Sequence, residues 1–192
     1  IEARSFGGHL MFEPWTVETK TGGFYKVYTP FWNTVKNREV DAPLTQPTSI
    51  KSPTSWPFSD HISDWRLDKE MGRGTVVVRP FVQLGEKVAQ TRLADFIENK
   101  VATYVEGRDI PAQARTSNLS ENLALGEISP HQCWHTAMRA FNEGQFGAET
   151  FLKELVWREF AYHLMHHTPW ILDQNWKDGW DAFPWNTNGS SP

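Results

Sequence analysis

The clearest helical pattern in the chain lies between residues 151 and 160. Apolar side chains return there every three or four residues, the spacing of one face of an α-helix, at Phe151, Leu152, Leu155, Val156 and Phe160. On such a helix Glu154, Trp157 and Arg158 stand at i, i+3 and i+4 and share one face beside the apolar stripe. The pattern predicts an amphipathic helix that presents an acid, an indole ring and a guanidinium together.

Three more helices are predicted before this stretch, two of them between residues 88 and 126. Residues 88–104 place apolar side chains at helical spacing, and the pattern stops near Gly107. A loop through Pro111 follows, because proline cannot continue a helix. A shorter helical segment then runs from about residue 117 to Gly126.

The start of the next helix carries a clear local signal. Ser129 is a preferred N-cap residue, and Pro130 suits the first helical position, where an N–H would have no helical partner. Gln132 lies three residues after the cap, which is the spacing of a capping box. We expect this helix to end at Gly144.

The first 85 residues show no comparable helical pattern. Alternation around Tyr25 and Val27 favours a short strand. Pro30 should end it, because proline lacks an amide donor and disfavours helical geometry at Thr29. Four prolines, with Ser and Thr between them, lie within residues 43–57 and favour an extended connector.

Composition narrows the class of protein. The chain has 192 residues, 39% hydrophobic and 14% aromatic, which is enough to bury at least one core. Its net charge of −4 argues against a protein that only coats nucleic acid, although a local basic patch is compatible with it. One cysteine, Cys133, excludes an intramolecular disulfide. We find no signal peptide and no apolar run of roughly 18 residues, so we expect a soluble, cytoplasmic protein.

Each polar motif also has an ordinary structural explanation. Glu154 and Arg158 suit a surface ion pair worth only ~0.3 to 0.5 kcal/mol, with Trp157 as a packing residue. The run TSNLS (116–120) suits a helix cap, and its hydroxyl and amide groups also suit a phosphate. Three histidines stand at i, i+3 and i+4, at His163, His166 and His167. Without a fitting carboxylate or an HExxH pattern they favour a polar helix face, and we predict no metal site.

Taken together, five runs resemble the DNA photolyase and cryptochrome family in order and spacing. They are Tyr104 with GRDIP (107–111), TSNLS (116–120), LALGEISP (123–130), KELVWREF (153–160) and FPW (183–185). The resemblance is greatest to the bacterial cyclobutane-dimer photolyases and covers nearly the whole chain. One position departs from the family's TSRLS motif, since Asn118 stands in place of the arginine and removes a fixed positive charge.

The resemblance implies an α+β fragment with three parts. Residues 1–42 would be the end of an α/β, Rossmann-like antenna domain, and residues 43–85 a proline-rich interdomain connector. Residues 86–192 would be the first half of an all-α FAD-binding domain. We therefore expect a part of a longer protein. This part alone should be inactive and hold FAD poorly, because many of the family's flavin contacts lie downstream.

The resemblance also implies a flavin site and a lesion site. The FAD-binding residues would be Tyr104, Thr116, Ser117, Asn118, Leu119, Ser120, Phe151, Glu154 and Arg158. Glu154 and Trp157 would contact a flipped pyrimidine dimer, which costs less to extrude than a normal base because it has lost its pairing and stacking. Arg108 would lie near the DNA backbone. Trp185 would be the outermost tryptophan of the chain that photoreduces the flavin.

The function implied by the resemblance is light-driven DNA repair. Reduced FAD would donate an electron to a cyclobutane pyrimidine dimer, with Glu154, Trp157 and Trp185 as the catalytic side chains. An antenna pigment such as methenyltetrahydrofolate would be a second chromophore, with Glu2 as a candidate contact. The enzyme would be a monomeric lyase whose partner is damaged DNA. The alternatives are a cryptochrome, which senses blue light without repair, and a helical DNA-binding module without a cofactor.

Overall fold

Helices are the only regular elements in the part of the chain that the structure describes. The structure is a computed structural model, and it describes residues 2–4, 6–67 and 69–184. The α-helices there are α1 (Tyr28–Val35), α2 (Arg73–Val78), α3 (Glu86–Asn99), α4 (Tyr104–Gly107), α5 (Ser120–Ala124), α6 (Pro130–Asn142) and α7 (Gly147–His167). Short 3₁₀ helices cover Pro14–Thr16, Ile62–Trp65, Lys69–Met71, Arg79–Phe81, Val101–Thr103, Pro169–Leu172 and Asp178–Ala182. The helical part of the predicted fold class is confirmed, and no described residue forms a strand.

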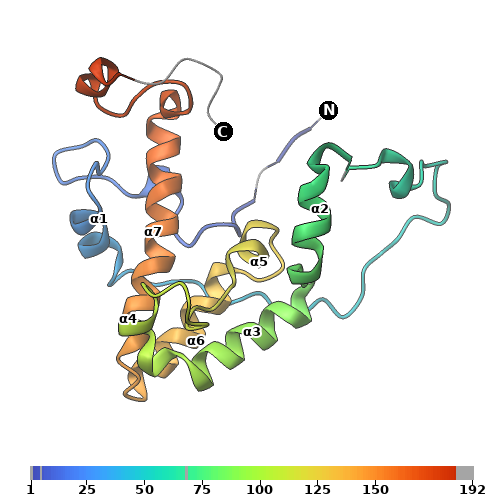
Figure 1. The fold of residues 1–192 in the computed structure, drawn as a ribbon, viewed down its shortest axis with the longest axis horizontal. Coiled ribbons are helices and arrows are strands. Elements are labelled where there is room, and N and C mark those ends of the chain that lie inside the picture. Colours follow the sequence, from blue (N-terminus) through green and yellow to red (C-terminus); the bar gives the residue numbers. More distant parts are fainter. Residues whose placement is uncertain (1, 5, 68, 185–192) are drawn as a thin grey trace.

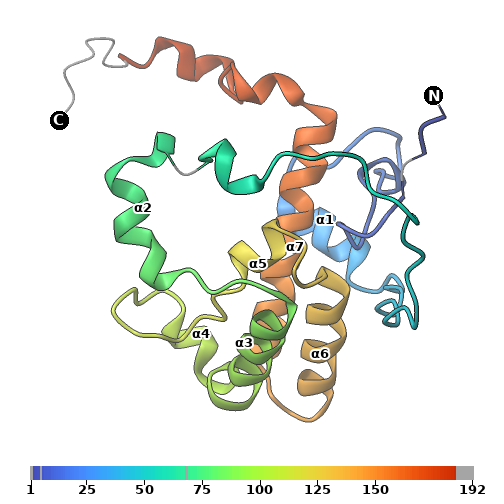
Figure 2. The same cartoon turned by 90° about the vertical axis from the view of Figure 1, so that its right-hand side faces the viewer.

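The long helix α7 is the centre of the fold (Figure 1). It packs along α6 and also contacts α1, α4 and the 3₁₀ helix Val101–Thr103. All five side chains of the apolar stripe predicted from the sequence are buried. Helix α2 stands apart from α7 in both views of the chain (Figure 2). Among the described residues, no helix combines the length and apolarity that crossing a bilayer requires.

The predicted start of α6 is confirmed in detail. The Ser129 hydroxyl accepts a hydrogen bond from the Gln132 N–H at 3.1 Å. The Gln132 side-chain oxygen accepts the Ser129 N–H at 3.1 Å, which completes the capping box. Helix α6 then ends at Asn142, and Gly144 adopts a φ of 94°, which glycine tolerates without steric cost.

The strand expected around Tyr25 and Val27 is wrong, because the chain enters α1 at Tyr28. Pro30 lies inside the first turn of α1, where the backbone N–H groups have no partner within the helix. Proline therefore removes nothing from this helix, and Thr29 is helical despite preceding it.

Two other segments differ from their predicted form. The helix predicted over residues 88–104 breaks after Asn99, and the break lets both Val101 and Tyr104 turn into the core, where they are 1% and 7% exposed. Helices also occur within the predicted connector 43–85, where α2 and three 3₁₀ helices follow an irregular stretch up to residue 61. Their apolar side chains, such as Val76 and Phe81, remain exposed.

The N-terminal segment is bonded to α7 through a buried carboxylate. Glu159 is 1% exposed, and its Oε2 accepts the backbone N–H groups of Met11 at 2.8 Å and Phe12 at 3.1 Å. The Arg158 guanidinium donates to the other Glu159 oxygen at 3.0 Å. Burial raises the pKa of the Glu159 carboxyl to about 7, and it outweighs these hydrogen bonds and the arginine charge, which lower that pKa.

We therefore expect the Glu159 contribution to stability to fall as pH rises from about 4.5 to about 7. In this range the folded protein binds the Glu159 proton more tightly than the unfolded chain does, and the total loss should be about 3 kcal/mol. Glu159→Gln should remove this loss, because the amide does not titrate. The free energy of unfolding of the natural protein that contains this chain, measured by urea titration between pH 5 and 8, checks this expectation.

The pH dependence of the free energy of unfolding has to be compared between the wild type and Glu159→Gln, because a second buried group also titrates. Burial lowers the pKa of His163 to about 4, so its neutral form stabilises the fold and that contribution is lost as pH falls below 6.5. This opposes the Glu159 effect in the wild type. Glu98→Gln, at an exposed position, is the matched control and should keep the wild-type pH dependence. An unchanged slope in Glu159→Gln would contradict the raised pKa.

The start of α7 approaches the backbone at Val101 very closely. A Cβ atom added to Gly147 would lie 1.8 Å from the Val101 carbonyl oxygen and 3.6 Å from the Tyr104 Cβ. Only a residue without a side chain fits there without backbone movement. This contact sets how near α7 lies to Tyr104.

Gly147→Ala should therefore destabilise the protein by about 2 to 3 kcal/mol through overpacking against a backbone atom. Gly74→Ala is the control, because nothing lies within 4 Å of its added Cβ and alanine favours the helix α2 that contains it. Thermal unfolding of both variants measures the difference. Equal melting temperatures of the two variants would contradict this expectation, because they would mean that the backbone at Val101 moves aside at little cost.

Candidate functional site

A pocket of about 560 Å³ lies between the TSNLS turn and α7. All nine residues predicted to bind FAD line this pocket. They come from α4, from the turn that leads into α5 together with the first residue of α5, and from α7, three segments that are separate in the sequence. Four further lining residues were missed by sequence reasoning: Leu123, Ala124, Leu155 and Tyr162. The helical period on α7 could have found Leu155 and Tyr162, which lie four residues after Phe151 and Arg158.

The hydroxyl-rich turn forms the polar wall of the pocket. Asn118 has a φ of 54°, in the left-handed region that asparagine tolerates better than most residues. Its side-chain oxygen accepts the Thr116 hydroxyl at 3.0 Å, and its carbonyl accepts the Arg92 guanidinium at 3.1 Å. Helix α5 starts only at Ser120 and has five residues, so its dipole is small. The polar groups of this wall are therefore the hydroxyl groups of the turn and the Asn118 amide.

Aromatic rings form the apolar base of the pocket. Tyr104 is 7% exposed and meets the ring of Phe96 edge-on, with ring centroids 5.1 Å apart. The ring of Phe96 in turn lies 4.7 Å from that of Phe151. Burial, followed by the charge of Glu154, raises the pKa of the Tyr104 hydroxyl, so it stays protonated at neutral pH.

Glu154 is paired with an arginine from a distant part of the chain. Its carboxylate accepts a hydrogen bond from the Arg108 guanidinium, which also lies over the Tyr104 ring with its carbon 5.8 Å from the ring centroid. This hydrogen bond to Glu154 is the largest cause that raises the pKa of Arg108. The spacing on α7 suggested a surface ion pair between Glu154 and Arg158, and this prediction is wrong. Glu154 pairs with Arg108, and Arg158 donates to the His9 carbonyl.

Arg158 is held from the N-terminal segment. It donates to the His9 carbonyl at 3.0 Å and to the His9 ring Nε2 at 2.8 Å. That nitrogen also lies 2.7 Å from the Tyr162 hydroxyl, and the guanidinium carbon lies 5.0 Å from the Tyr162 ring centroid. Burial and the charge of Arg158 both lower the pKa of His9, which favours its neutral form as an acceptor.

Trp157 does not line the pocket, although Glu154 and Arg158 of the same helix do. The residue is 45% exposed, and its ring stacks on that of Tyr28, with centroids 3.7 Å apart and planes at 7°. Trp185 lies outside the residues that the structure describes. Glu2, the candidate antenna-pigment contact, is exposed, pairs with Arg4 at the surface and lines none of the pockets described here.

The three histidines of α7 do not share a polar face. His163 is 1% exposed, and its Nε2 accepts the Tyr25 N–H at 3.0 Å, so the predicted polar face is wrong for this residue. His167 stacks on the ring of Phe24 at 4.8 Å. Within the described part of the chain, no three His, Cys, Asp or Glu side chains gather in a group that could hold a metal ion.

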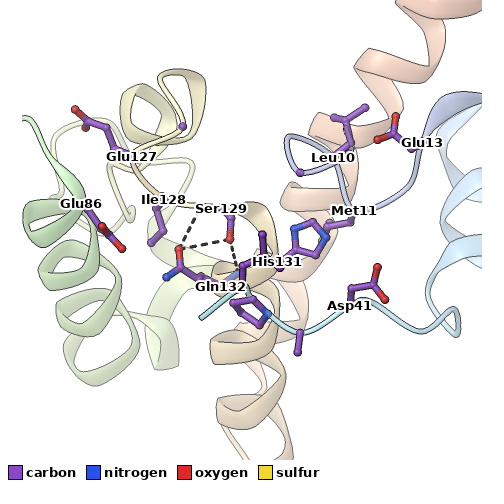
Figure 3. Close-up of a pocket in the computed structure, with 16 residues that line it drawn as sticks. Leu10, Met11, Glu13, Asp41, Glu86, Glu127, Ile128, Ser129, His131 and Gln132 are labelled. Carbon is purple, nitrogen blue, oxygen red and sulfur yellow. Dashed lines mark hydrogen bonds between the residues drawn. The ribbon is translucent and has the colours of Figure 1, made fainter. Parts of the chain in front are cut away.

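A second pocket, of about 540 Å³, lies between the N-terminal segment, residues 41–44 and the start of α6, and has a different chemistry (Figure 3). Four carboxylates line it, at Glu13, Asp41, Glu86 and Glu127. Like charges repel, so this pocket is unfavourable for a phosphate group. Of the two pockets, the one with hydroxyl groups and Arg158 is the better site for an anionic cofactor.

Known proteins support the resemblance seen in the motifs. A family model described as DNA photolyase matches residues 1–48. A deoxyribodipyrimidine photo-lyase of Agrobacterium fabrum is 41% identical over 100% of this chain and 40% of its own length, and one of Thermus thermophilus is 32% identical over 92% and 38%. A crystal structure of a bacterial class III photolyase from Agrobacterium tumefaciens matches 97% of this chain and 39% of that chain, with a TM-score of 0.89 and 40% identity. The chain spans about two fifths of the length of these relatives.

The left-handed residue in the turn gives a local test of the pocket wall. Asn118→Ala should be less stable than Asn118→Gly by about 1 kcal/mol, because a Cβ without a polar group disfavours a positive φ whereas glycine does not. Urea unfolding of the natural protein measures the difference. Ser117→Ala, next to it in the same turn, is the control and should stay within about 0.5 kcal/mol of the wild type. Equal stability of the two Asn118 variants would contradict this turn geometry.

Proposed function

We propose that this chain, a relative of the DNA photolyases, forms part of the flavin site and of the lesion-contacting surface of a deoxyribodipyrimidine photolyase. One observation carries the proposal. Tyr104, the TSNLS turn and α7 line a single pocket, and α7 also carries the exposed indole of Trp157. The relatives named above bear the name of this activity.

The pocket suits the parts of a flavin dinucleotide. Hydroxyl groups of Ser117 and Ser120 can donate to a pyrophosphate, and Arg158 contributes a positive charge from the α7 side of the same pocket. Phe151 and Leu155 offer an apolar surface to a planar ring. The absence of the family's arginine at position 118 leaves Arg158 as the cation that lines the pocket among the described residues. We therefore assign FAD to this pocket.

When bound in its reduced form and excited by light, FAD would supply one electron to the dimer, and the electron would return to the flavin after the cyclobutane ring has split. The side chains of this chain would bind and orient the two partners. Trp157 would stack on the flipped pyrimidines, because an aromatic face binds any planar base. The Glu154 carboxylate would accept an N–H of a pyrimidine, and its pairing with Arg108 would fix its orientation. Arg108 would also approach a phosphate of the DNA backbone.

Trp157→Ala should weaken dark binding of a DNA oligonucleotide with a single thymine dimer by at least about fivefold, because base stacking on an aromatic side chain contributes ~1 to 3 kcal/mol. Flavin content should stay unchanged, since Trp157 does not line the pocket. Trp56→Ala is the matched control, because Trp56 is 74% exposed and far from this site in sequence. Fluorescence anisotropy of labelled DNA measures the affinity in the natural protein.

Illumination separates the proposal from its alternatives. Repair by the wild type that falls with Trp157→Ala or Glu154→Gln supports a photolyase. Bound flavin without any repair would identify a cryptochrome-type sensor instead. Purified protein without a flavin absorption band would contradict the assignment of FAD and favour a DNA-binding module. Normal dimer binding and repair by Trp157→Ala would refute the role given to that ring.

A further inference from the structure

One face of the Trp157 indole is covered by the ring of Tyr28. The two rings are nearly parallel, at 7°, with centroids 3.7 Å apart, which is close aromatic stacking. The remaining ring neighbour, Phe160, meets the indole edge-on at 75°. Because Trp157 is nonetheless 45% exposed, its free surface lies on the side away from Tyr28.

Tyr28 is itself fixed to the helix that carries Trp157. Its hydroxyl donates a hydrogen bond of 2.7 Å to the Lys153 carbonyl oxygen. In an α-helix the carbonyl of residue 153 also accepts the N–H of residue 157, so Tyr28 bonds to the same turn of α7. Burial raises the pKa of Tyr28, so the hydroxyl remains protonated and able to donate at neutral pH.

Tyr28 reaches this position from the other end of the chain. It is the first residue of α1, and its ring also packs edge-on against Phe160 of the core, with centroids 5.9 Å apart. Helix α1 in turn contacts α7. The tyrosine ring is therefore a rigid support: its hydroxyl, its edge and its face each have a partner on α7.

We propose that Tyr28 is a positioning residue for Trp157, which holds the indole in one orientation and leaves only its outer face for a flipped pyrimidine. This inference rests on the function proposed above. A supported ring loses little side-chain freedom when a base stacks on it, so less of the stacking energy is spent on ordering the indole. Without Tyr28, the Trp157 ring can rotate about its side-chain bonds, and the dimer has to select the stacked orientation.

The test compares three residues at position 28 in the natural holoprotein. Tyr28→Leu keeps an apolar side chain but removes the flat support, and it should weaken binding to an oligonucleotide with one thymine dimer by about three- to tenfold. Tyr28→Phe keeps the ring and should restore affinity to within about twofold of the wild type. Binding to undamaged DNA, flavin content and the melting temperature are measured alongside.

A double-mutant cycle separates positioning from packing. If Tyr28 acts through Trp157, Tyr28→Leu should cause no further loss of dimer affinity in the Trp157→Ala background. The same fold-loss in both backgrounds would overturn the inference, as would unchanged dimer affinity in a folded Tyr28→Leu protein. Dimer binding that survives Trp157→Ala alone would instead refute the stacking role that the proposed function gives to Trp157, so the two failures can be distinguished.

A measurement on the protein that keeps Tyr28 tests the inference even if Tyr28→Leu does not fold. Protein labelled with 5-fluorotryptophan gives one ¹⁹F resonance for residue 157, assigned by its loss in Trp157→Phe. Stacking on Tyr28 should give this resonance a ring-current shift away from the denatured position, and Tyr28→Phe should retain that shift. A resonance at the denatured position would overturn the inference.

Discussion

The Glu159 carboxylate, buried in the middle of α7, accepts the backbone N–H groups of Met11 and Phe12 and the guanidinium of Arg158. An unpaired N–H or carboxylate at this depth would cost several times the free energy of an ordinary hydrogen bond, so the segment and the helix have one favourable register. The neighbouring residues then point in directions that follow from this register. Arg158 faces the pocket, where His9 of the same segment holds it, and Phe160 enters the core beneath Tyr28.

Much of the fold follows from local sequence patterns, and these were predictable. The stripe of α7 and the capping box at Ser129 depend on residues three or four positions apart, so periodicity and composition suffice to find them. The pocket lining came from motifs that resemble a known family, because the contact between Tyr104 and α7 spans about 50 residues and leaves no period in the sequence. The position of α1 was misjudged for a local reason, since Pro30 is harmless only within the first helical turn.

The pairing of charged side chains was beyond sequence reasoning. Spacing on α7 suggested that Glu154 pairs with Arg158, but their partners are Arg108 and His9, from segments far away in the chain. A charged side chain on a helix can pair either with a residue one turn away or with a residue from another segment that packs nearby. A pair between neighbouring turns stabilises the fold only slightly, so it is easily replaced by a tertiary contact. The support under Trp157 was hidden in the same way, because Tyr28 lies in a segment whose helix was not recognised.

Because Gly147 lies tightly against the Val101 carbonyl, a tilt of α7 would turn about the first residue of the helix, which would then act as a pivot. Phe151 lies one turn beyond this point, whereas Trp157 lies about 15 Å along the helix axis. A rigid tilt of about 4° around the pivot therefore moves the indole by roughly 1 Å but the base of the pocket by only a fraction of that. Small rotations of α7 would thus move mainly the Trp157 ring. The aromatic base of the pocket near Tyr104 would stay almost in place.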